Sequence, residues 1–78
     1  MARHIVTLVK GCGNFRALRE AAGVPLEGLA VAAGVPFLEA FMADYGGFLR
    51  SETAIKFSRL IGQPFDDLFD VVTVIPTR

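Results

Sequence analysis

The sequence predicts a mainly α-helical domain of five short helices with a small antiparallel β-ribbon formed by its two ends. Three observations support this prediction. Glycine and proline interrupt the chain repeatedly, apolar side chains recur at three- and four-residue spacing between the interruptions, and β-branched residues are concentrated near both ends. We expect all 78 residues to form one domain, with the helices inside 14–69 and the strands at about 4–9 and 71–75.

The composition excludes several classes of protein. Hydrophobic residues make up 53% of the chain, which is too many for intrinsic disorder. Eight basic and eight acidic residues give a net charge of zero, so the total charge does not indicate a nucleic-acid partner. The single cysteine, Cys12, has no disulfide partner, no cysteine–histidine spacing fits zinc, and no apolar stretch is long enough for a signal peptide or a membrane span. We therefore expect a cytoplasmic protein with no metal, no other cofactor and no membrane association.

A turn separates the first strand from the first helix. β-branched residues dominate 4–9, and Gly11-Cys12-Gly13-Asn14 then has the composition of a turn. Asn14 is suited to cap the first helix, and Gly23 is suited to end it. The expected inner face of this helix comprises Phe15, Leu18, Arg19 and Ala22.

Two more short helices follow, and a turn joins them. Pro25 suits the first position of the second helix, and Gly34 suits its end. Its apolar stripe comprises Leu26, Leu29, Ala30 and Ala33. The third helix is expected to open at Val35-Pro36, to run over 37–44 or one residue further, and to end at Gly46-Gly47. Two short helices joined by a glycine-containing turn are the outline of a helix-turn-helix.

Two further helices and a strand complete the chain. Ser51 is expected to cap the fourth helix, Gly62 to end it, and Pro64 to start the fifth. The expected inner faces are Ala54, Ile55, Phe57, Ser58 and Ile61 in the fourth helix, and Phe65, Leu68 and Phe69 in the fifth. The strand 71–75 can pair with the first strand of its own chain or with a second chain, in which case it would build a homodimer. The high apolar content of so small a chain also favours self-association.

A set of short motifs within residues 14–69 keeps a characteristic spacing. They are Leu18-Arg19-Glu20, Gly23-Val24, Leu29-Ala30, Gly34-Val35, Gly46, Ser51-Glu52-Thr53-Ala54 and the segment L-I-G-Q-P-F-D-D-L-F at 60–69. In these motifs the chain resembles the Cro and lambda-repressor-like (XRE-type) helix-turn-helix family. The resemblance implies a five-helix domain whose third helix enters the major groove of duplex DNA, usually as a dimer on a palindromic site.

The resemblance also assigns roles to single residues. Arg19 matches an arginine of the family's first helix and Asp44 an acid near the end of its third, so we expect an ion pair between them. Contacts to the DNA backbone are expected from Arg16, Gly47, Arg50, the Ser51 cap and Lys56. Each of these five residues can equally be ordinary solvated surface.

The sequence departs from the family where DNA contact matters most. Pro25-Leu26 stand where family members commonly have Thr-Gln at the start of the second helix. The expected surface of the recognition helix is Pro36, Phe37, Leu38, Phe41 and Met42. None of these side chains can read a base edge by hydrogen bonding. The only charges on this helix, Glu39 and Asp44, would repel phosphates if they faced them.

Two arrangements can account for the apolar residues of the third helix. In the first, the helix is rotated so that Phe37, Phe41 and their apolar neighbours, Tyr45 included, form core while the alanines face outward. In the second, Ala40 and Ala43 face inward and the large residues are exposed, as at a protein–protein contact. The direction in which Phe37 and Phe41 point distinguishes the two arrangements.

The leading functional hypothesis is a small transcriptional regulator, similar to a phage Cro-type repressor, that binds double-stranded DNA as a dimer. The alternative is a helix-turn-helix adapted to bind protein, such as an antirepressor or a regulator-docking protein, through Phe37, Leu38 and Phe41. We expect no enzymatic activity and no catalytic residues, because the single histidine, His4, has no catalytic companions and Gly11–Asn14 lacks the lysine and spacing of a phosphate loop.

Overall fold

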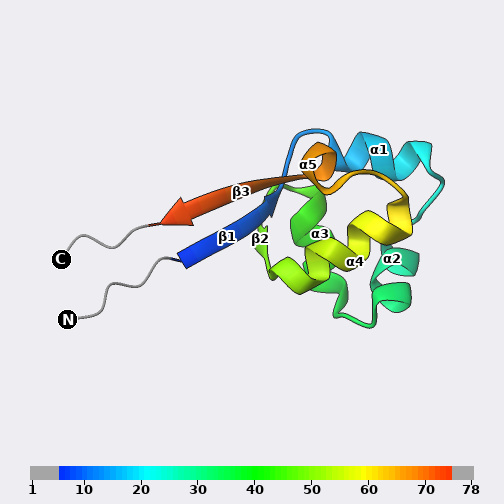
Figure 1. Ribbon diagram of the computed structural model, residues 1–78. Helices are drawn as coiled ribbons and strands as arrows, with labels where there is room; N and C mark the ends of the chain where they lie inside the picture. The colour runs from blue at the N-terminus through cyan, green and yellow to red at the C-terminus, as the bar shows by residue number, and fades with distance from the viewer. Residues whose placement is uncertain (1–5, 75–78) are drawn as a thin grey trace, which may run out of the picture.

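The computed structural model describes residues 6–74, so the expected strand residues His4, Ile5 and Ile75 lie outside the described range. Within that range the chain has five helices and three strands (Figure 1). The elements in chain order are β1 (Val6–Gly11), α1 (Phe15–Ala21), α2 (Leu26–Ala33), α3 (Phe37–Asp44), β2 (Phe48–Leu49), α4 (Ser51–Ile61), α5 (Phe65–Leu68) and β3 (Phe69–Val74). The predicted mainly helical fold with five helices is confirmed.

Glycine and proline set the ends of the helices as predicted. Gly34 and Gly62 end α2 and α4 with φ of 71° and 78°, a left-handed conformation that is strained for other residues. Pro25, Pro36 and Pro64 each stand immediately before the first helical residue of α2, α3 and α5, in an extended conformation. Pro25 and Pro64 were each expected to be the first residue of a helix, and each instead precedes that residue.

Two predicted helix caps differ from the structure. Arg50 stands immediately before α4 and has the extended backbone of a capping position. Ser51 is therefore the first helical residue and does not cap the helix. Asn14 does precede α1, but its backbone is already helical and its side chain makes no capping hydrogen bond. A capping side chain normally requires extended backbone at its own position. Neither polar residue has the geometry that the sequence suggested.

The two terminal strands pair with each other. β1 and β3 are antiparallel in a register that runs from Val6 opposite Val74 to Gly11 opposite Phe69, so the pairing within one chain is confirmed. β1 continues two residues beyond the predicted end of the strand, because Lys10 and Gly11 keep pairing with Asp70 and Phe69. Phe69, expected in the fifth helix, therefore belongs to the sheet.

A third strand joins the ribbon near the helices. β2 pairs antiparallel with β1 at Val9 and Lys10 only, which gives the sheet order β2-β1-β3. The ribbon predicted from the two ends is thus part of a three-stranded sheet. Two-residue strands have no readable period, so the sequence offered no pattern from which to predict β2.

The helices and the near end of the sheet enclose one apolar core. Its aromatic centre is Phe15, whose ring centroid lies 5.4 Å from that of Phe69 and 6.2 Å from that of Phe57. The inner face of α4 differs from the prediction, because Ile55 is 44% exposed and Thr53 is buried in its place. The buried apolar residues are Val9, Phe15, Leu29, Ala30, Ala33, Ala40, Ala43, Ala54, Phe57, Ile61, Leu68 and Phe69.

β1 passes very close to the end of α3. A Cβ atom at Gly11 would overlap the carbonyl oxygen of Ala43, so this approach requires glycine. The Gly11 N–H also donates a hydrogen bond of 3.4 Å to the carbonyl of Gly47, in the segment after α3. These contacts fix the end of α3 against the sheet.

Candidate functional site

The orientation of α3 decides between the two arrangements considered for its apolar residues. Ala40 and Ala43 are 0% exposed, whereas Phe37, Leu38 and Phe41 are 47%, 64% and 39% exposed. The rotated arrangement, in which the large residues form core, is therefore wrong. The alanines face the interior, and the large apolar side chains face solvent.

The exposed large side chains of α3 form a row, and we call Phe37, Leu38, Phe41 and Tyr45 the α3 outer face. The rings stand four residues apart, with centroid distances of 6.4 Å from Phe37 to Phe41 and 4.5 Å from Phe41 to Tyr45. An open depression of about 370 Å³ lies beside the row, between α2 and α3. It is lined by Glu27, Ala30, Val31, Val35 and Phe37.

Pro36 and Met42, the other two residues of the expected recognition surface, differ in exposure. Pro36 is exposed immediately before α3. Met42 is only half exposed, because its side chain packs over Gly47, where a Cβ atom would overlap its methyl group. Met42 therefore belongs to the contact between α3 and the segment that follows it.

Arg19 and Asp44 form the predicted ion pair, which joins α1 to the end of α3. The Arg19 guanidinium donates two hydrogen bonds to the Asp44 carboxylate, of 2.9 Å from Nε and 3.1 Å from Nη2. A third hydrogen bond of 2.9 Å goes from Nη1 to the carbonyl of Val24, just before α2. The Asp44 side chain is 2% exposed, so the pair is shielded from water. One arginine thus connects α1, the start of α2 and α3.

Arg16, expected to bind a DNA phosphate, contacts the same carboxylate. Its Nε lies 3.3 Å from Asp44 Oδ2, and its guanidinium carbon lies 5.5 Å from the centre of the Tyr45 ring. A cation in this position is stabilised by both the carboxylate and the ring face. The side chain remains 55% exposed, so a further ligand can still reach it.

Glu39 joins α3 to the start of α4 through two contacts that the sequence analysis missed. It accepts hydrogen bonds of 2.6 Å from the Thr53 hydroxyl and 2.8 Å from Arg50 Nη2. The Thr53 hydrogen bond, with a smaller contribution from Arg50, lowers the pKa of Glu39, while partial burial opposes this shift. The hydrogen bond between Arg50 and Glu39 in turn raises the pKa of Arg50. The partners lie 14 and 11 residues from Glu39, so no helical spacing relates them.

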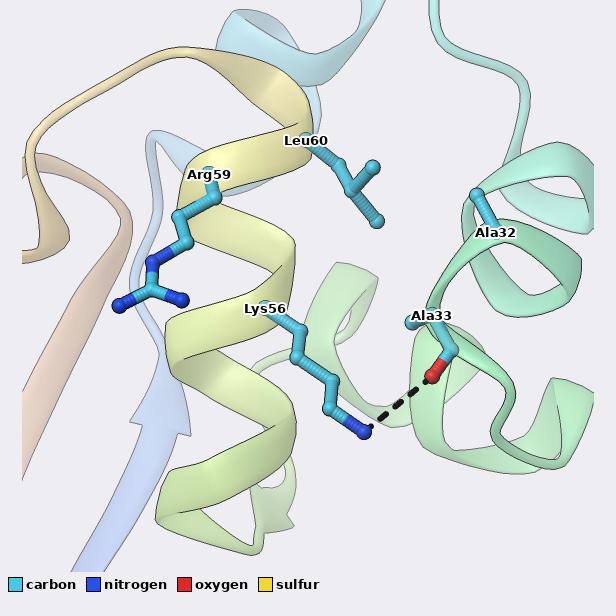
Figure 2. Close-up of a pocket in the computed structure, with 5 residues that line it drawn as sticks. All are labelled: Ala32, Ala33, Lys56, Arg59 and Leu60. Carbon is cyan, nitrogen blue, oxygen red and sulfur yellow. Dashed lines mark hydrogen bonds between the residues drawn. The ribbon is translucent and has the colours of Figure 1, made fainter.

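The other residues expected at the DNA backbone lie on or before α4. Gly47 packs under Met42, and Ser51 is exposed at the first position of the helix. Lys56 reaches back to α2, where its Nζ donates a hydrogen bond of 3.4 Å to the carbonyl of Ala33 (Figure 2). Of the five expected residues, Arg16, Arg50 and Lys56 carry charge, and all three are engaged within the chain.

A shallow groove separates α4 from α2. Leu60 of α4 points toward Ala32 of α2 across this groove, Lys56 spans it lower down, and Arg59 points away from α2 (Figure 2). The groove has a volume of about 400 Å³ and is open to solvent. Its lining is mainly apolar, with cationic groups only on the α4 side.

Among residues 6–74 no cluster of three His, Cys, Asp or Glu side chains is arranged to bind a metal ion. The Cys12 thiol donates a hydrogen bond of 3.1 Å to the carbonyl of Asp67, which ties the turn after β1 to α5. Within the same range, none of the helices has the length and apolar character needed to cross a bilayer.

No family model, no curated protein and no solved structure matches the chain. The resemblance to the Cro and lambda-repressor-like family therefore rests on residue spacing alone.

Proposed function

We propose that this chain is a helix-turn-helix regulator that acts through protein contact by the α3 outer face. The observation that carries the proposal is the exposure of Phe37, Leu38 and Phe41 on the helix that would enter the major groove in a Cro-like domain. Such side chains can touch thymine methyl groups but cannot hydrogen bond to base edges. A contiguous exposed apolar patch is instead typical of a protein-binding surface.

The charges around α3 support the same proposal. Arg16 and Arg50 are the two arginines expected at DNA phosphates, and each faces a carboxylate of its own chain, Asp44 and Glu39 respectively. A phosphate would have to compete with these carboxylates for the arginines. With a net charge of zero, the chain also provides little long-range attraction for a polyanion.

The surface indicates the chemistry of the partner. A row of rings at four-residue spacing fits one apolar side of an amphipathic helix, and the depression between α2 and α3 can receive a side chain from it. Glu27 is the only charged residue that lines this depression. We therefore expect the partner to present apolar residues flanked by a lysine or arginine.

Site-specific photo-crosslinking tests this proposal. A photoreactive phenylalanine analogue at Leu38 is expected to capture a partner in cells, whereas the same analogue at Ile55, an exposed apolar position on α4, is expected not to capture it. The captured protein is then purified, and its dissociation constant is measured against variants of the chain. Phe37→Ser and Phe41→Ser are each expected to weaken binding at least about tenfold, as at the centre of an interface.

Ile55→Ser provides the matched control, because Ile55 has an exposed fraction similar to that of Phe37. Its affinity for the partner is expected to stay within about twofold of wild type, as for positions outside an interface. Equal capture from both positions, or equal affinity of the Phe41→Ser and wild-type chains, would contradict the proposal.

DNA binding remains a second candidate function because of one observation. Arg19 holds α1, the start of α2 and the end of α3 together, and such bracing would suit a helix pair that docks as a rigid unit on duplex DNA. Lys56 and Arg59 are also exposed on α4. The candidate therefore has a scaffold and some cations, but no base-reading side chains.

Fluorescence anisotropy with a labelled duplex from the chain's own upstream region tests this candidate. Binding through several phosphates must weaken steeply between about 50 mM and about 200 mM salt. Arg16→Ala and Lys56→Ala should each reduce the slope of log K against log salt by about one if these residues contact phosphates. Absence of binding at about 50 mM salt would remove DNA as a ligand and leave the protein-binding proposal intact.

A further inference from the structure

The β-ribbon extends away from the helices with little to cover it. β1 and β3 run side by side out of the helical body (Figure 1). β2 covers the other edge of β1 only at Val9 and Lys10, so the part of the ribbon from Val6 to Leu8 consists of two strands. β3 is an edge strand along its whole length, and no described element pairs with its outer edge.

A ribbon of this kind is not expected to be stable in isolation. Two-stranded antiparallel ribbons are marginal in water, and independent stability needs a third strand or packing against a helix. The side chains of the ribbon are only partly covered, since Val71 is 53% exposed, Thr7 and Thr73 are exposed, and Leu8 and Val72 are half-buried. The described arm therefore has β-branched residues typical of a sheet interior but lacks the neighbouring strands.

The outer edge of β3 also lacks the features that normally prevent strand addition. Natural edge strands are protected by lysine, proline, bulges or short length. β3 is six residues long and contains no lysine or proline, and its pairing with β1 is continuous. Its only charged residue, Asp70, lies at the end nearest the helices, opposite Lys10.

We infer that the outer edge of β3 pairs antiparallel with β3 of a second copy of this chain. The edge is self-complementary, because an antiparallel pair of identical strands is related by a two-fold axis and closes as a dimer. With the axis at Val72, each Asp70 lies opposite Val74 of the second copy, so the two Asp70 side chains are at opposite ends of the pair and do not repel each other. Parallel pairing would instead place them side by side.

The resulting sheet has six strands in the order β2-β1-β3-β3-β1-β2. Each ribbon then gains the neighbouring strand that it lacks in the single chain. The dimer carries two copies of the α3 outer face, but the inference does not depend on what that face binds. It follows from the sheet edge alone.

Solution mass with two matched lysine variants tests the inference. Thr73 and Thr7 are opposite each other in the register and both are exposed, but only Thr73 lies on β3, the strand whose outer edge is inferred to pair. The wild-type chain is expected to have twice its mass of 8.4 kDa by light scattering or sedimentation at micromolar concentration. Thr73→Lys is expected to weaken the dimer at least about tenfold, because lysine protects edge strands, whereas Thr7→Lys stays dimeric.

Four results would overturn the inference. They are a wild-type chain that is monomeric at several hundred micromolar, dimers of equal strength in both lysine variants, equal dissociation in both, and dissociation of the dimer by Phe41→Ser. The last would place the interface on α3. Circular dichroism verifies that each variant is folded.

Amide hydrogen exchange of the wild-type chain gives a second measurement that needs no variant. The outward-facing amides of β3 are expected to lose protection on dilution, while those between β1 and β3 keep it. Protection in β3 that is independent of concentration contradicts the inference.

Discussion

The two sides of α3 differ in residue size and in burial, and the difference is the reverse of what a hydrophobic core usually shows. The inner side carries Ala40 and Ala43, which are fully buried. The outer side carries Phe37, Leu38 and Phe41, which are exposed. Large apolar side chains contribute most when they are buried, so residues chosen for stability alone would be placed the other way round.

The inner side of α3 approaches the sheet closely. The backbone carbonyl of Ala43 meets β1 at Gly11, where the strand has no room for a side chain. The Arg19–Asp44 pair then fixes the end of the helix relative to α1. These inner contacts position α3, while the large residues outside are only partly covered. The contrast predicts that changes on the inner side affect stability more than changes on the outer side.

The largest expected effect is that of Arg19→Leu, on the inner side. The substitution leaves the Asp44 carboxylate buried with only Arg16 beside it, and breaking a buried ion pair in this way costs about 3 kcal/mol. Thermal unfolding is expected to shift down by more than about 10 °C in a domain of this size.

Two controls accompany the Arg19 variant. Arg59→Leu removes an exposed arginine of α4 and is expected to change stability by less than about 0.5 kcal/mol. The double variant Arg19→Leu/Asp44→Leu is expected to recover part of the loss, because it leaves no unpaired buried charge. A melting temperature of Arg19→Leu equal to that of wild type would show that the ion pair does not hold the helices together.

A second large effect is expected from filling the space on the inner side. Ala40→Leu adds three carbon atoms at a fully buried position and should cost about 2 kcal/mol through overpacking. The same change at Ala32, an exposed position on α2, should be nearly neutral. Chemical denaturation of both variants measures the difference. Equal midpoints would mean that α3 is not closely packed on its inner side.

The sequence predicted the helices well because their ends are determined locally. Glycines with positive φ and prolines before the first turn act within a few residues, so positions such as Gly34, Pro36 and Gly62 could be read directly. The Arg19–Asp44 pair was predicted from family resemblance. No local rule connects residues 25 positions apart.

The site itself was less predictable. Periodicity identified an apolar stripe on α3 but could not tell which side of the helix faced the core, because both sides are apolar. The orientation is fixed by contacts between distant segments, such as the close approach of Gly11 to Ala43, which only the folded chain creates. The Glu39 contacts were missed for the same reason, since Arg50 and Thr53 reach Glu39 only after α4 has packed beside α3.

A smaller effect is expected from Thr53→Val, in the contact between α4 and Glu39 of α3. The variant keeps the shape of the side chain but removes the hydrogen bond to Glu39, which should cost about 1 kcal/mol and raise the pKa of Glu39 toward its usual range. Ser51→Ala is the control, because Ser51 makes no capping hydrogen bond and its loss should be nearly neutral. A loss of about 1 kcal/mol in Ser51→Ala would instead support the cap that the sequence suggested.

The contribution of Glu39 is expected to depend on pH. Its pKa is lowered in the folded chain, so the stabilisation is complete above the usual glutamate value of about 4.3 and is lost as the pH falls through the lower folded value. The difference in stability between wild type and Thr53→Val should therefore be constant near neutral pH and shrink below about pH 4. Denaturant unfolding at several pH values measures it. A difference that grows on acidification would contradict the assignment.

The smallest effect on stability is expected from Leu38→Gln, on the outer side. Leu38 is the most exposed residue of the row on α3, and glutamine has a helix propensity close to that of leucine, so the free energy of unfolding should change by less than about 0.5 kcal/mol. If the outer face binds a protein, the same variant should weaken that complex while the melting temperature stays unchanged. A loss of about 2 kcal/mol or more in stability would instead mean that Leu38 is packed as core, and the contrast between the two sides of α3 would no longer hold. Under the proposed function, stability and binding should respond to opposite sides of one helix, and Leu38→Gln and Ala40→Leu, two positions apart, should separate them.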